Sequence, residues 1–268
     1  MSSLLKLCER AARAGGEILL EMQGKVEPIA KGPNDLVTEA DFASQKVVLE
    51  ILSRAHPDHL MLAEENTGGD ADRDSQHAGP IGPEQYRWIV DPLDGTINYV
   101  HNAPSYAVSV ALERGGELLV GVVYDPVMDE CFTAAAGDGA FLNGQRIHTS
   151  TCDAMKDALV AVSFSTKVAR GSVEIRRFVE VLHESHTIRR LGSAALNLCY
   201  LASGRLDGYF ANAVKTWDVA AGMLILREAG GTVSSPNGGP FDLYRPQFAC
   251  AATDRLRAEL VEILARVE

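Results

Sequence analysis

The chain has 268 residues, of which 46% are hydrophobic and 23% are charged. These proportions are ordinary for a globular protein with a substantial buried core. Lys and Arg number 25 against 36 Asp and Glu, which gives a formal net charge of −11. Proteins that bind a nucleic-acid backbone need basic patches, so this balance argues against a nucleic-acid partner.

The cysteines and the apolar runs indicate the compartment. The five cysteines are scattered without a C-x-x-C pair, which is typical of reduced thiols. No stretch approaches the roughly 20 apolar residues of a membrane helix, and the N-terminus lacks the pattern of a signal peptide. We therefore expect a cytoplasmic protein without a membrane partner.

The first half of the chain predicts two helices and a series of strands. An amphipathic N-terminal helix ends at Gly24 and is followed by a strand at 26–30 and a polar hinge at 31–35. Thr38 and Asp41 form a capping-box pattern for a helix that stops at His56, before Pro57. A short apolar run at 60–63 leads into Glu64, and a Gly- and Asp-rich segment at 66–84 has no periodicity. Further strands are predicted at 87–90, 107–112, 118–123 and 131–136, and Asn-Gly at 143–144 indicates a hairpin.

The second half alternates strands and helices more regularly. Strands are predicted at 158–162, 187–190, 206–210 and 248–252, and helices at 173–185, 194–202, 217–229 and 255–267. This interleaving predicts an α/β or α+β fold. We expect one domain, 1–268, built of two subdomains of approximately 1–150 and 151–268.

The strongest local motif is WIVDPLDGTINY at residues 88–99. A hydrophobic strand brings Asp91 to its carboxyl end, and Asp94 follows three residues later. This spacing can direct both carboxylates at one point, and hard cations such as Mg2+ prefer oxygen ligands of this kind. A bare D-x-x-D-G is more often a polar turn, but the preceding strand and the length of the motif favour a metal site.

Three weaker signals accompany this motif. Glu64 and Glu65 follow an apolar run, Asp218 lies at the start of a predicted helix, and Gly192-Ser193-Ala194 precedes another helix. Each has an ordinary alternative: a solvated surface, a carboxylate that complements the helix dipole, or a serine N-cap. Zinc-hydrolase, serine-hydrolase, Walker A and dinucleotide motifs are not found in the sequence.

Taken together, these residues resemble the inositol monophosphatase family, within the Mg2+-dependent, lithium-sensitive phosphatase superfamily. The resemblance covers nearly the whole chain. It rests on DPLDGTINY at 91–99, WDVAAG at 217–222, DLVT at 35–38 with Asp41, EE at 64–65, GSA at 192–194, EAGG at 228–231 and GPFDL at 239–243.

The resemblance implies a layered αβαβα sandwich, a homodimer and a site for two or three Mg2+ ions. The implied metal ligands are Glu64, Asp91, Asp94, Asp218 and the backbone carbonyl of Leu93. Glu64 rather than Glu65 matches the family ligand. The implied catalytic residues, around a water activated by metal, are Glu64, Thr96 and Asp41. The implied substrate contacts are Glu64, Leu93, Gly95, Thr96, Gly192, Ser193, Ala194 and Asp218, and Lys31 with the 31–35 segment is expected to form a mobile loop that helps seat one ion.

One position departs from the family pattern. Where inositol-specific members carry a glutamate that contacts sugar hydroxyls, this chain has Ala211, and neither Asn212 nor Lys215 provides an anionic acceptor. Inositol monophosphate is the first expected substrate. Fructose 1,6-bisphosphate, histidinol phosphate and 3′-phosphoadenosine 5′-phosphate remain open, as does a non-catalytic regulatory binding protein.

Overall fold

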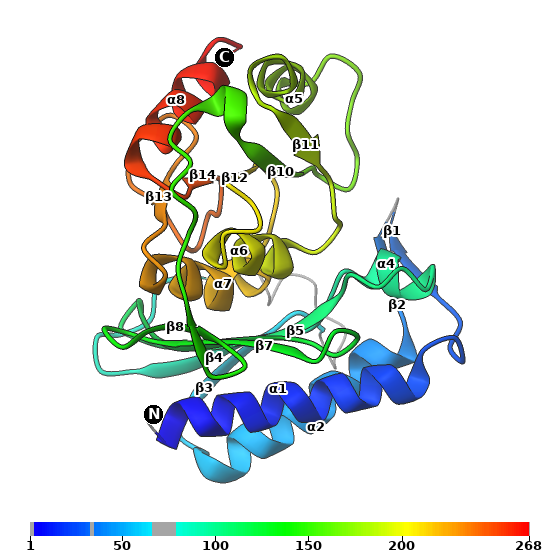
Figure 1. Ribbon diagram of the computed structural model, residues 1–268. Helices are drawn as coiled ribbons and strands as arrows, with labels where there is room; N and C mark the ends of the chain where they lie inside the picture. Colours follow the sequence, from blue (N-terminus) through cyan, green and yellow to red (C-terminus); the bar gives the residue numbers. More distant parts are fainter. Residues whose placement is uncertain (1–2, 33–34, 66–78, 268) are drawn as a thin grey trace.

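The computed structural model describes residues 3–32, 35–65 and 79–267, and the elements stack in five layers (Figure 1). Helices α1 (Ser3–Met22) and α2 (Glu39–Ala55) cover one face of a seven-stranded sheet. Helices α6 (Ala194–Ala202) and α7 (Thr216–Glu228) lie between that sheet and a five-stranded one. Helices α5 (Val173–Glu184) and α8 (Asp254–Ala265) cover the outer face. The predicted αβαβα sandwich is confirmed.

The large sheet is mostly antiparallel. Its strand order is β3-β4-β5-β6-β7-β8-β9, and only β3 and β4 run parallel. Parallel neighbours end at the same edge, so the residues that follow β3 and those that close β4 lie together. The strands are β3 (Leu60–Ala63), β4 (Tyr86–Asp94), β5 (Ala107–Arg114), β6 (Glu117–Asp125), β7 (Glu130–Ala135), β8 (Gly139–Leu142) and β9 (Gln145–Ile147).

The small sheet mixes parallel and antiparallel pairs in the order β11-β10-β12-β14-β13. Strand β12 is parallel to β10 and antiparallel to β14, and β10 is parallel to β11. The C-terminal ends of β10, β11 and β12 therefore face the same side. The strands are β10 (Leu159–Ser163), β11 (Thr187–Arg189), β12 (Gly208–Ala211), β13 (Thr232–Ser234) and β14 (Phe248–Ala251), and a short 3-10 helix, η1 (Met155–Asp157), precedes β10.

The middle helices pack unusually close to their neighbours because small residues line the contacts. A Cβ on Gly121 of β6 would lie 3.0 Å from the backbone of Ala221 in α7, and one on Gly222 would lie 2.7 Å from Leu198 in α6. Glycine at these positions allows α7 to lie directly on the large sheet and against α6. Asp218, in the first turn of α7, is thereby held close to the strands of the other half.

The predicted elements are largely confirmed, with a few shifted ends. The first strand is displaced to β1 (Ile29–Gly32), which pairs with β2 (Asp35–Val37), because Pro28 has no N–H to contribute to a ladder. Residues 33–34 of the predicted mobile loop and 66–78 of the aperiodic segment lie outside the described residues. Among the described helices, none combines the length and the apolar character needed to cross a membrane.

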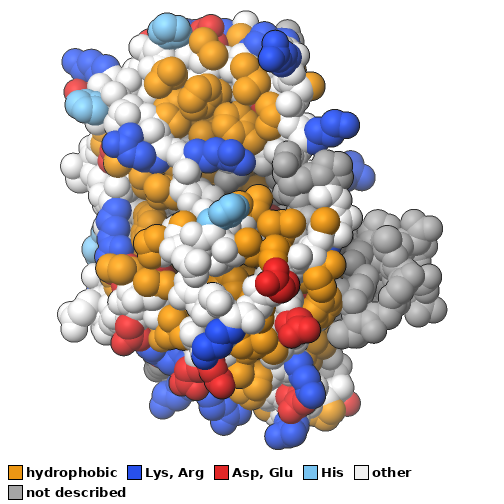
Figure 2. All heavy atoms as spheres, turned by 90° about the vertical axis from the view of Figure 1, so that its right-hand side faces the viewer, with side chains coloured by type: hydrophobic (Ala, Val, Ile, Leu, Met, Phe, Trp, Pro, Cys, Tyr) orange, Lys and Arg blue, Asp and Glu red, His pale blue; other side chains and the backbone are white. Residues whose placement is uncertain are grey.

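Helix α5 exposes much of its hydrophobic surface. Val173, Val179 and Leu182 are exposed, whereas Arg177 and Val181 are buried. Figure 2, which views the right-hand side of Figure 1, shows hydrophobic side chains gathered on the upper half of this face, around α5. The helix therefore packs Val181, Phe178 and Arg177 toward the interior and leaves three of its apolar residues exposed.

Candidate active site

The signature motif places two carboxylates where β4 ends. The ladder between β4 and β5 is irregular between Asp91 and Asp94, which lets the chain bend there. The amide of Leu93 donates to Asp91 Oδ1 over 3.0 Å. Gly95 follows with φ 96°, and a Cβ there would lie 2.8 Å from the Ser105 carbonyl oxygen, so only glycine suits the turn.

Asp94 is held by residues that lie about a hundred positions away. Its Oδ2 atom accepts hydrogen bonds from the hydroxyl of Ser193 and, at 2.7 Å, from the amide of Ala195. Ser193 also caps α6 by accepting from the amide of Leu196 over 3.1 Å. The carboxylate thus occupies the N-terminus of α6, where free N–H groups favour anions. This contact joins the two predicted subdomains at the site.

Glu64 and Glu65 follow β3 directly. The amide of Glu64 donates to the carbonyl oxygen of Val90 over 3.1 Å, which continues the pairing of β3 with β4. Gln45 of α2 fixes Glu65 by exchanging backbone hydrogen bonds through its side-chain amide. Lys31 of β1 pairs with Glu65, and its Nζ lies 3.5 Å from a carboxylate oxygen of Glu64. The ammonium group therefore supplies positive charge at the edge of the site.

Thr96, Asp41 and Thr38 form a hydrogen-bonded chain beside these carboxylates. The hydroxyl of Thr96 lies 3.3 Å from Asp41 Oδ1 and 3.1 Å from the carbonyl oxygen of Leu93. Asp41 Oδ2 accepts from the amide and the hydroxyl of Thr38, as the predicted capping box requires. Desolvation of this buried group raises the pKa of Asp41. The structure therefore brings together the residues to which the resemblance assigned the attacking water.

The pKa values of the four predicted carboxylate ligands are all raised. Burial raises the pKa of Glu64 to about 7 and that of Asp94 to about 6. Burial, followed by the charge of Glu64, raises the pKa of Asp91, and burial, followed by the charge of Asp94, raises that of Asp218. Like charges that are buried together oppose ionisation. A bound cation would relieve this repulsion.

The chemistry of the predicted ligands suits a hard divalent cation, because all of them are oxygen donors: four carboxylates and the carbonyl oxygen of Leu93. The side chains are not arranged as ligands around one point. Within the described ranges, no group of three or more His, Cys, Asp or Glu is placed to hold a metal ion. Asp94 is bound by N–H and O–H donors, and Asp218 Oδ2 accepts from the amide of Lys215 over 2.8 Å. Metal binding would therefore require some of these carboxylates to turn from their present partners.

The position at which the sequence departs from the family pattern lies at the buried end of a strand. Ala211 closes β12, is fully buried and pairs with Ser163 and Phe248. Asn212 does not face the site freely, because its Oδ1 accepts from Arg177 over 2.5 Å. Lys215 is exposed. No side-chain acceptor for sugar hydroxyls replaces the missing glutamate among these three positions.

Two positioning residues were missed by the sequence reasoning. Ser44 donates to the carbonyl oxygen of Pro92 over 2.9 Å, and Gln45 holds Glu65. Both lie on the buried face of α2 that also carries Asp41. Their spacing of three and four residues from Asp41 was the available signal, since such positions share one face of a helix.

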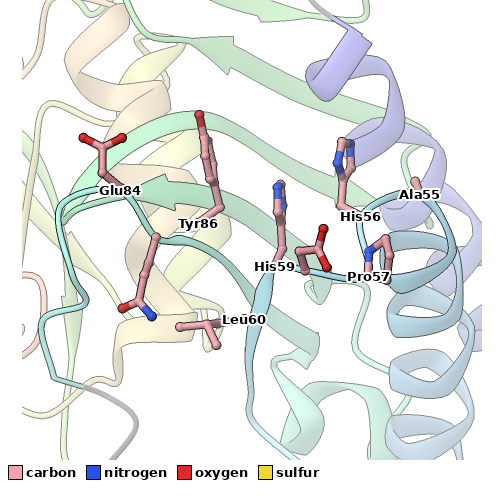
Figure 3. A pocket seen from close by; sticks show the side chains of 9 residues that line it. Ala55, His56, Pro57, His59, Leu60, Glu84 and Tyr86 are labelled. Atoms are coloured by element: carbon pink, nitrogen blue, oxygen red, sulfur yellow. The ribbon is translucent and has the colours of Figure 1, made fainter.

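A separate hollow of about 470 Å³ lies at the opposite ends of α2, β3 and β4 (Figure 3). Its walls include the rings of His56, His59 and Tyr86, which form a row with centroids 4.4 and 4.8 Å apart. None of the site carboxylates lines this hollow. It is therefore distinct from the carboxylate site.

Comparison with known proteins agrees with the fold and the motifs. The model of the inositol monophosphatase family matches residues 1–268. An inositol-1-monophosphatase of Mesorhizobium japonicum is 41% identical over 246 residues, which cover 89% of this chain and 87% of that protein. The Nus factor SuhB of Escherichia coli (strain K12) is 38% identical and covers 99% of this chain and 100% of its own length.

Solved structures give the same result. The inositol monophosphatase from Anabaena (Nostoc) sp. PCC 7120 superposes with a TM-score of 0.84 at 34% identity. The match covers 99% of this chain and 96% of that one. The family match, the curated relatives and the fold agree over essentially the full length. The chain therefore belongs to the inositol monophosphatase family.

Proposed function

We propose that the protein is a Mg2+-dependent phosphomonoester hydrolase that acts on a small phosphorylated metabolite. The observation that carries this proposal is a cluster of four carboxylates, Glu64, Asp91, Asp94 and Asp218, whose pKa values are all raised by burial, with the charges of the other members adding to the rise at Asp91 and Asp218. Such a cluster is costly for a protein that does not bind cations. Membership of a phosphatase family supports the same activity.

Two or three Mg2+ ions would be held by Glu64, Asp91, Asp94, Asp218 and the carbonyl oxygen of Leu93. Bound there, the metal supplies positive charge that neutralises phosphate oxygens and lowers the pKa of water. The contact between Glu64 and Lys31 bears on this, because the ammonium of Lys31 then competes with a cation for the same carboxylate. Lys31 lies on β1, so this contact links the β1–β2 hairpin to metal binding.

Thr96 and Asp41 orient the attacking water in this proposal. The hydroxyl of Thr96 donates either to Asp41 or to the carbonyl oxygen of Leu93, which leaves its lone pairs free to accept a hydrogen from water. Glu64 would receive the second hydrogen of the same water. The backbone around Gly95 and Thr96, together with the turn at 192–194, would contact the phosphate, as the resemblance implies.

The first substrate to test is inositol monophosphate, because the Mesorhizobium relative is named for that activity. Fructose 1,6-bisphosphate, histidinol phosphate and 3′-phosphoadenosine 5′-phosphate form the rest of the panel. Phosphate release is measured with Mg2+, with EDTA and with added Li+. Release that requires Mg2+ and is inhibited by Li+ is expected, and no release from any substrate would refute the proposal.

We also propose a cytoplasmic homodimer. The exposed Val173, Val179 and Leu182 support an interface on α5, because exposed apolar residues that gather on one element are typical of interaction surfaces. Sedimentation velocity of the wild type and of Leu182→Glu tests this. A dimer that dissociates in the variant is expected, and a monomeric wild type at micromolar concentration would contradict it.

A second candidate is a regulatory binding protein. The relatives named Nus factor SuhB share 38% identity over nearly the full chain, which favours this alternative. The net charge of −11 makes a protein partner a better candidate than direct contact with nucleic acid. Intact carboxylates together with a complete lack of phosphatase activity under all metal conditions would favour this function.

A further inference from the structure

The orientation of α5 is unusual and points to a role for Arg177. Val179 and Leu182 of this helix are 39% and 46% exposed, whereas Arg177 is only 8% exposed. An amphipathic helix normally turns its apolar residues inward and its charged residues outward. The buried guanidinium of Arg177 donates to Asn212 Oδ1 over 2.5 Å, which fixes its position.

Arg177 lines a polar cavity of about 310 Å³ together with the loop that precedes β14. A second arginine, Arg245, also lines it, and its side chain makes no hydrogen bond or ion pair with the described residues. Asp242 is the one carboxylate of this lining, and its Oδ1 accepts from the amide of Tyr244 over 2.9 Å. Two arginines against one aspartate give the lining a net charge of +1, in a protein whose total is −11.

The cavity adjoins the segment that connects β12 to the carboxylate site. Gln247, which lines it, immediately precedes Phe248, the residue paired with Ala211 at the end of β12. Arg177 donates to Asn212, the residue after Ala211. The chain then enters α7, where the hydroxyl of Thr216 donates to the carbonyl oxygen of Leu243, over 3.1 Å. The same loop thus contacts the start of the helix that carries Asp218.

We infer that this cavity binds a second anionic group of the substrate, on the leaving-group side of the scissile phosphate. The inference rests on the proposed function and names the substrate class: phosphomonoesters whose alcohol carries another phosphate or a carboxylate. Arginine is suited to this because its planar guanidinium binds such groups through two hydrogen bonds. Asn212, which does not line the cavity, fixes one of the two arginines by accepting a hydrogen bond from Arg177. The substitution of an acidic position by Ala211 fits the same substrate, because it removes a negative charge from that side.

Kinetics test the substrate class. The ratio of kcat/KM for fructose 1,6-bisphosphate to that for fructose 1-phosphate is measured in the wild type, Arg245→Gln and Arg177→Gln. We expect this ratio to fall about tenfold or more in both variants, as loss of a charge-assisted hydrogen bond predicts. Arg10→Gln is the matched control, because Arg10 is exposed on α1 and remote from the cavity. An unchanged ratio in Arg245→Gln, which alters an exposed residue that folding does not require, overturns the inference.

A second measurement needs no turnover. Binding of inorganic phosphate is followed by calorimetry in EDTA, where the clustered carboxylates repel the anion and the cavity is the expected site. Arg245→Gln should weaken binding about tenfold, and Asp242→Asn should strengthen it, because it removes the negative charge of the lining. Equal binding in all variants overturns the inference. If Arg245→Gln loses phosphate binding but leaves the kcat/KM ratio of the two fructose phosphates unchanged, the substrate assignment is overturned. Failure of the proposed function would look different, because no substrate would then be hydrolysed.

Discussion

The two ends of α2, β3 and β4 contrast sharply. At one end these elements present Asp41, Glu64 and Asp91, which are crowded carboxylates with raised pKa values. At the other end they present His56, His59 and Tyr86, whose rings stack in a row (Figure 3).

The two ends differ in how far packing and hydrogen bonds offset the cost of burying their side chains. At the end that carries the rings, His56, His59 and Tyr86 pack against one another, and the Nδ1 atom of His59 is buried there without a hydrogen-bond partner among the described residues. At the other end, burial raises the pKa values of the carboxylates, and at Asp91 the charges of neighbouring carboxylates add to this rise. The carboxylate end therefore holds several buried ionisable groups at a free-energy cost, as expected of the end proposed to be functional.

The largest effect is expected from Asp94→Asn. The change keeps the shape of the side chain but removes charge from the proposed metal site, so kcat should fall at least about a hundred- to thousandfold. Phosphate release at saturating Mg2+ measures it, and circular dichroism checks that the fold is kept. Asp138→Asn, at an exposed turn, is the control. Near-normal turnover in Asp94→Asn would show that this carboxylate is not needed for catalysis.

Removal of metal should make the stability of the protein depend on pH through the carboxylate end. The pKa of Glu64 is raised to about 7, so the folded protein binds more protons than the unfolded chain between about pH 4 and 7. Stability of the metal-free protein should therefore fall as pH rises through this range. Mg2+ at a hundredfold its Kd should add about 2.7 kcal/mol.

Thermal unfolding at pH 6 and pH 8, with EDTA or Mg2+, measures this dependence. The midpoint should rise by about 5–10 °C with Mg2+, and more at pH 8 than at pH 6. A midpoint that does not respond to Mg2+ at either pH would contradict a divalent cation site.

Thr96→Val should have a smaller effect, confined to catalysis. The substitution removes the hydroxyl that contacts Asp41 and Leu93, so we expect kcat to fall about ten- to a hundredfold while KM changes less. Thr151→Val is the control, because Thr151 is exposed and its side chain makes no hydrogen bond with the described residues. A change in KM alone would place Thr96 in substrate binding rather than in orienting the water.

A substitution at the end that carries His56, His59 and Tyr86 should change the stability of the protein but not its activity. The Nδ1 atom of His59 is buried without a partner among the described residues, so His59→Phe should keep the stacking and stabilise the protein by about 1 kcal/mol. Burial lowers the pKa of His59, so the unfolded chain binds more protons below about pH 6.5. The wild type should therefore lose stability as pH falls below that value, and the variant should lose less.

Urea unfolding at pH 5.5 and 7.5 measures this difference, with His148→Phe at an exposed position as the control. kcat should be unaffected in His59→Phe. A loss of kcat comparable to that of Thr96→Val would mean that the two ends are coupled.

Several features were predictable because their signals are local. The capping box of Thr38 and Asp41 lies within four residues, and the structure shows its hydrogen bonds. The bend that positions Asp91 and Asp94 follows from a short motif and the need for glycine at position 95. Residues 91–99 and 217–222 also carried the family resemblance, which the comparisons confirm.

Other features had no local signal. The hydroxyl of Ser193 donates to Asp94, a residue 99 positions away. Likewise, Arg177 and Asn212 come from different elements and meet only because α5 packs against the end of β12. Hydrogen bonds over such separations leave no periodic trace in the sequence, and the inward orientation of Arg177 opposes the amphipathic pattern of its own helix.

The sequence by itself determined the class of fold, the carboxylates and the missing glutamate at Ala211, because each is written in a contiguous motif or in its absence. Only the tertiary structure decided what surrounds them. The N-terminus of α6 holds Asp94, Lys31 reaches Glu64, and two arginines line the cavity beyond Ala211. These arrangements depend on the packing of α6 and α7 between two sheets, which brings distant segments into contact.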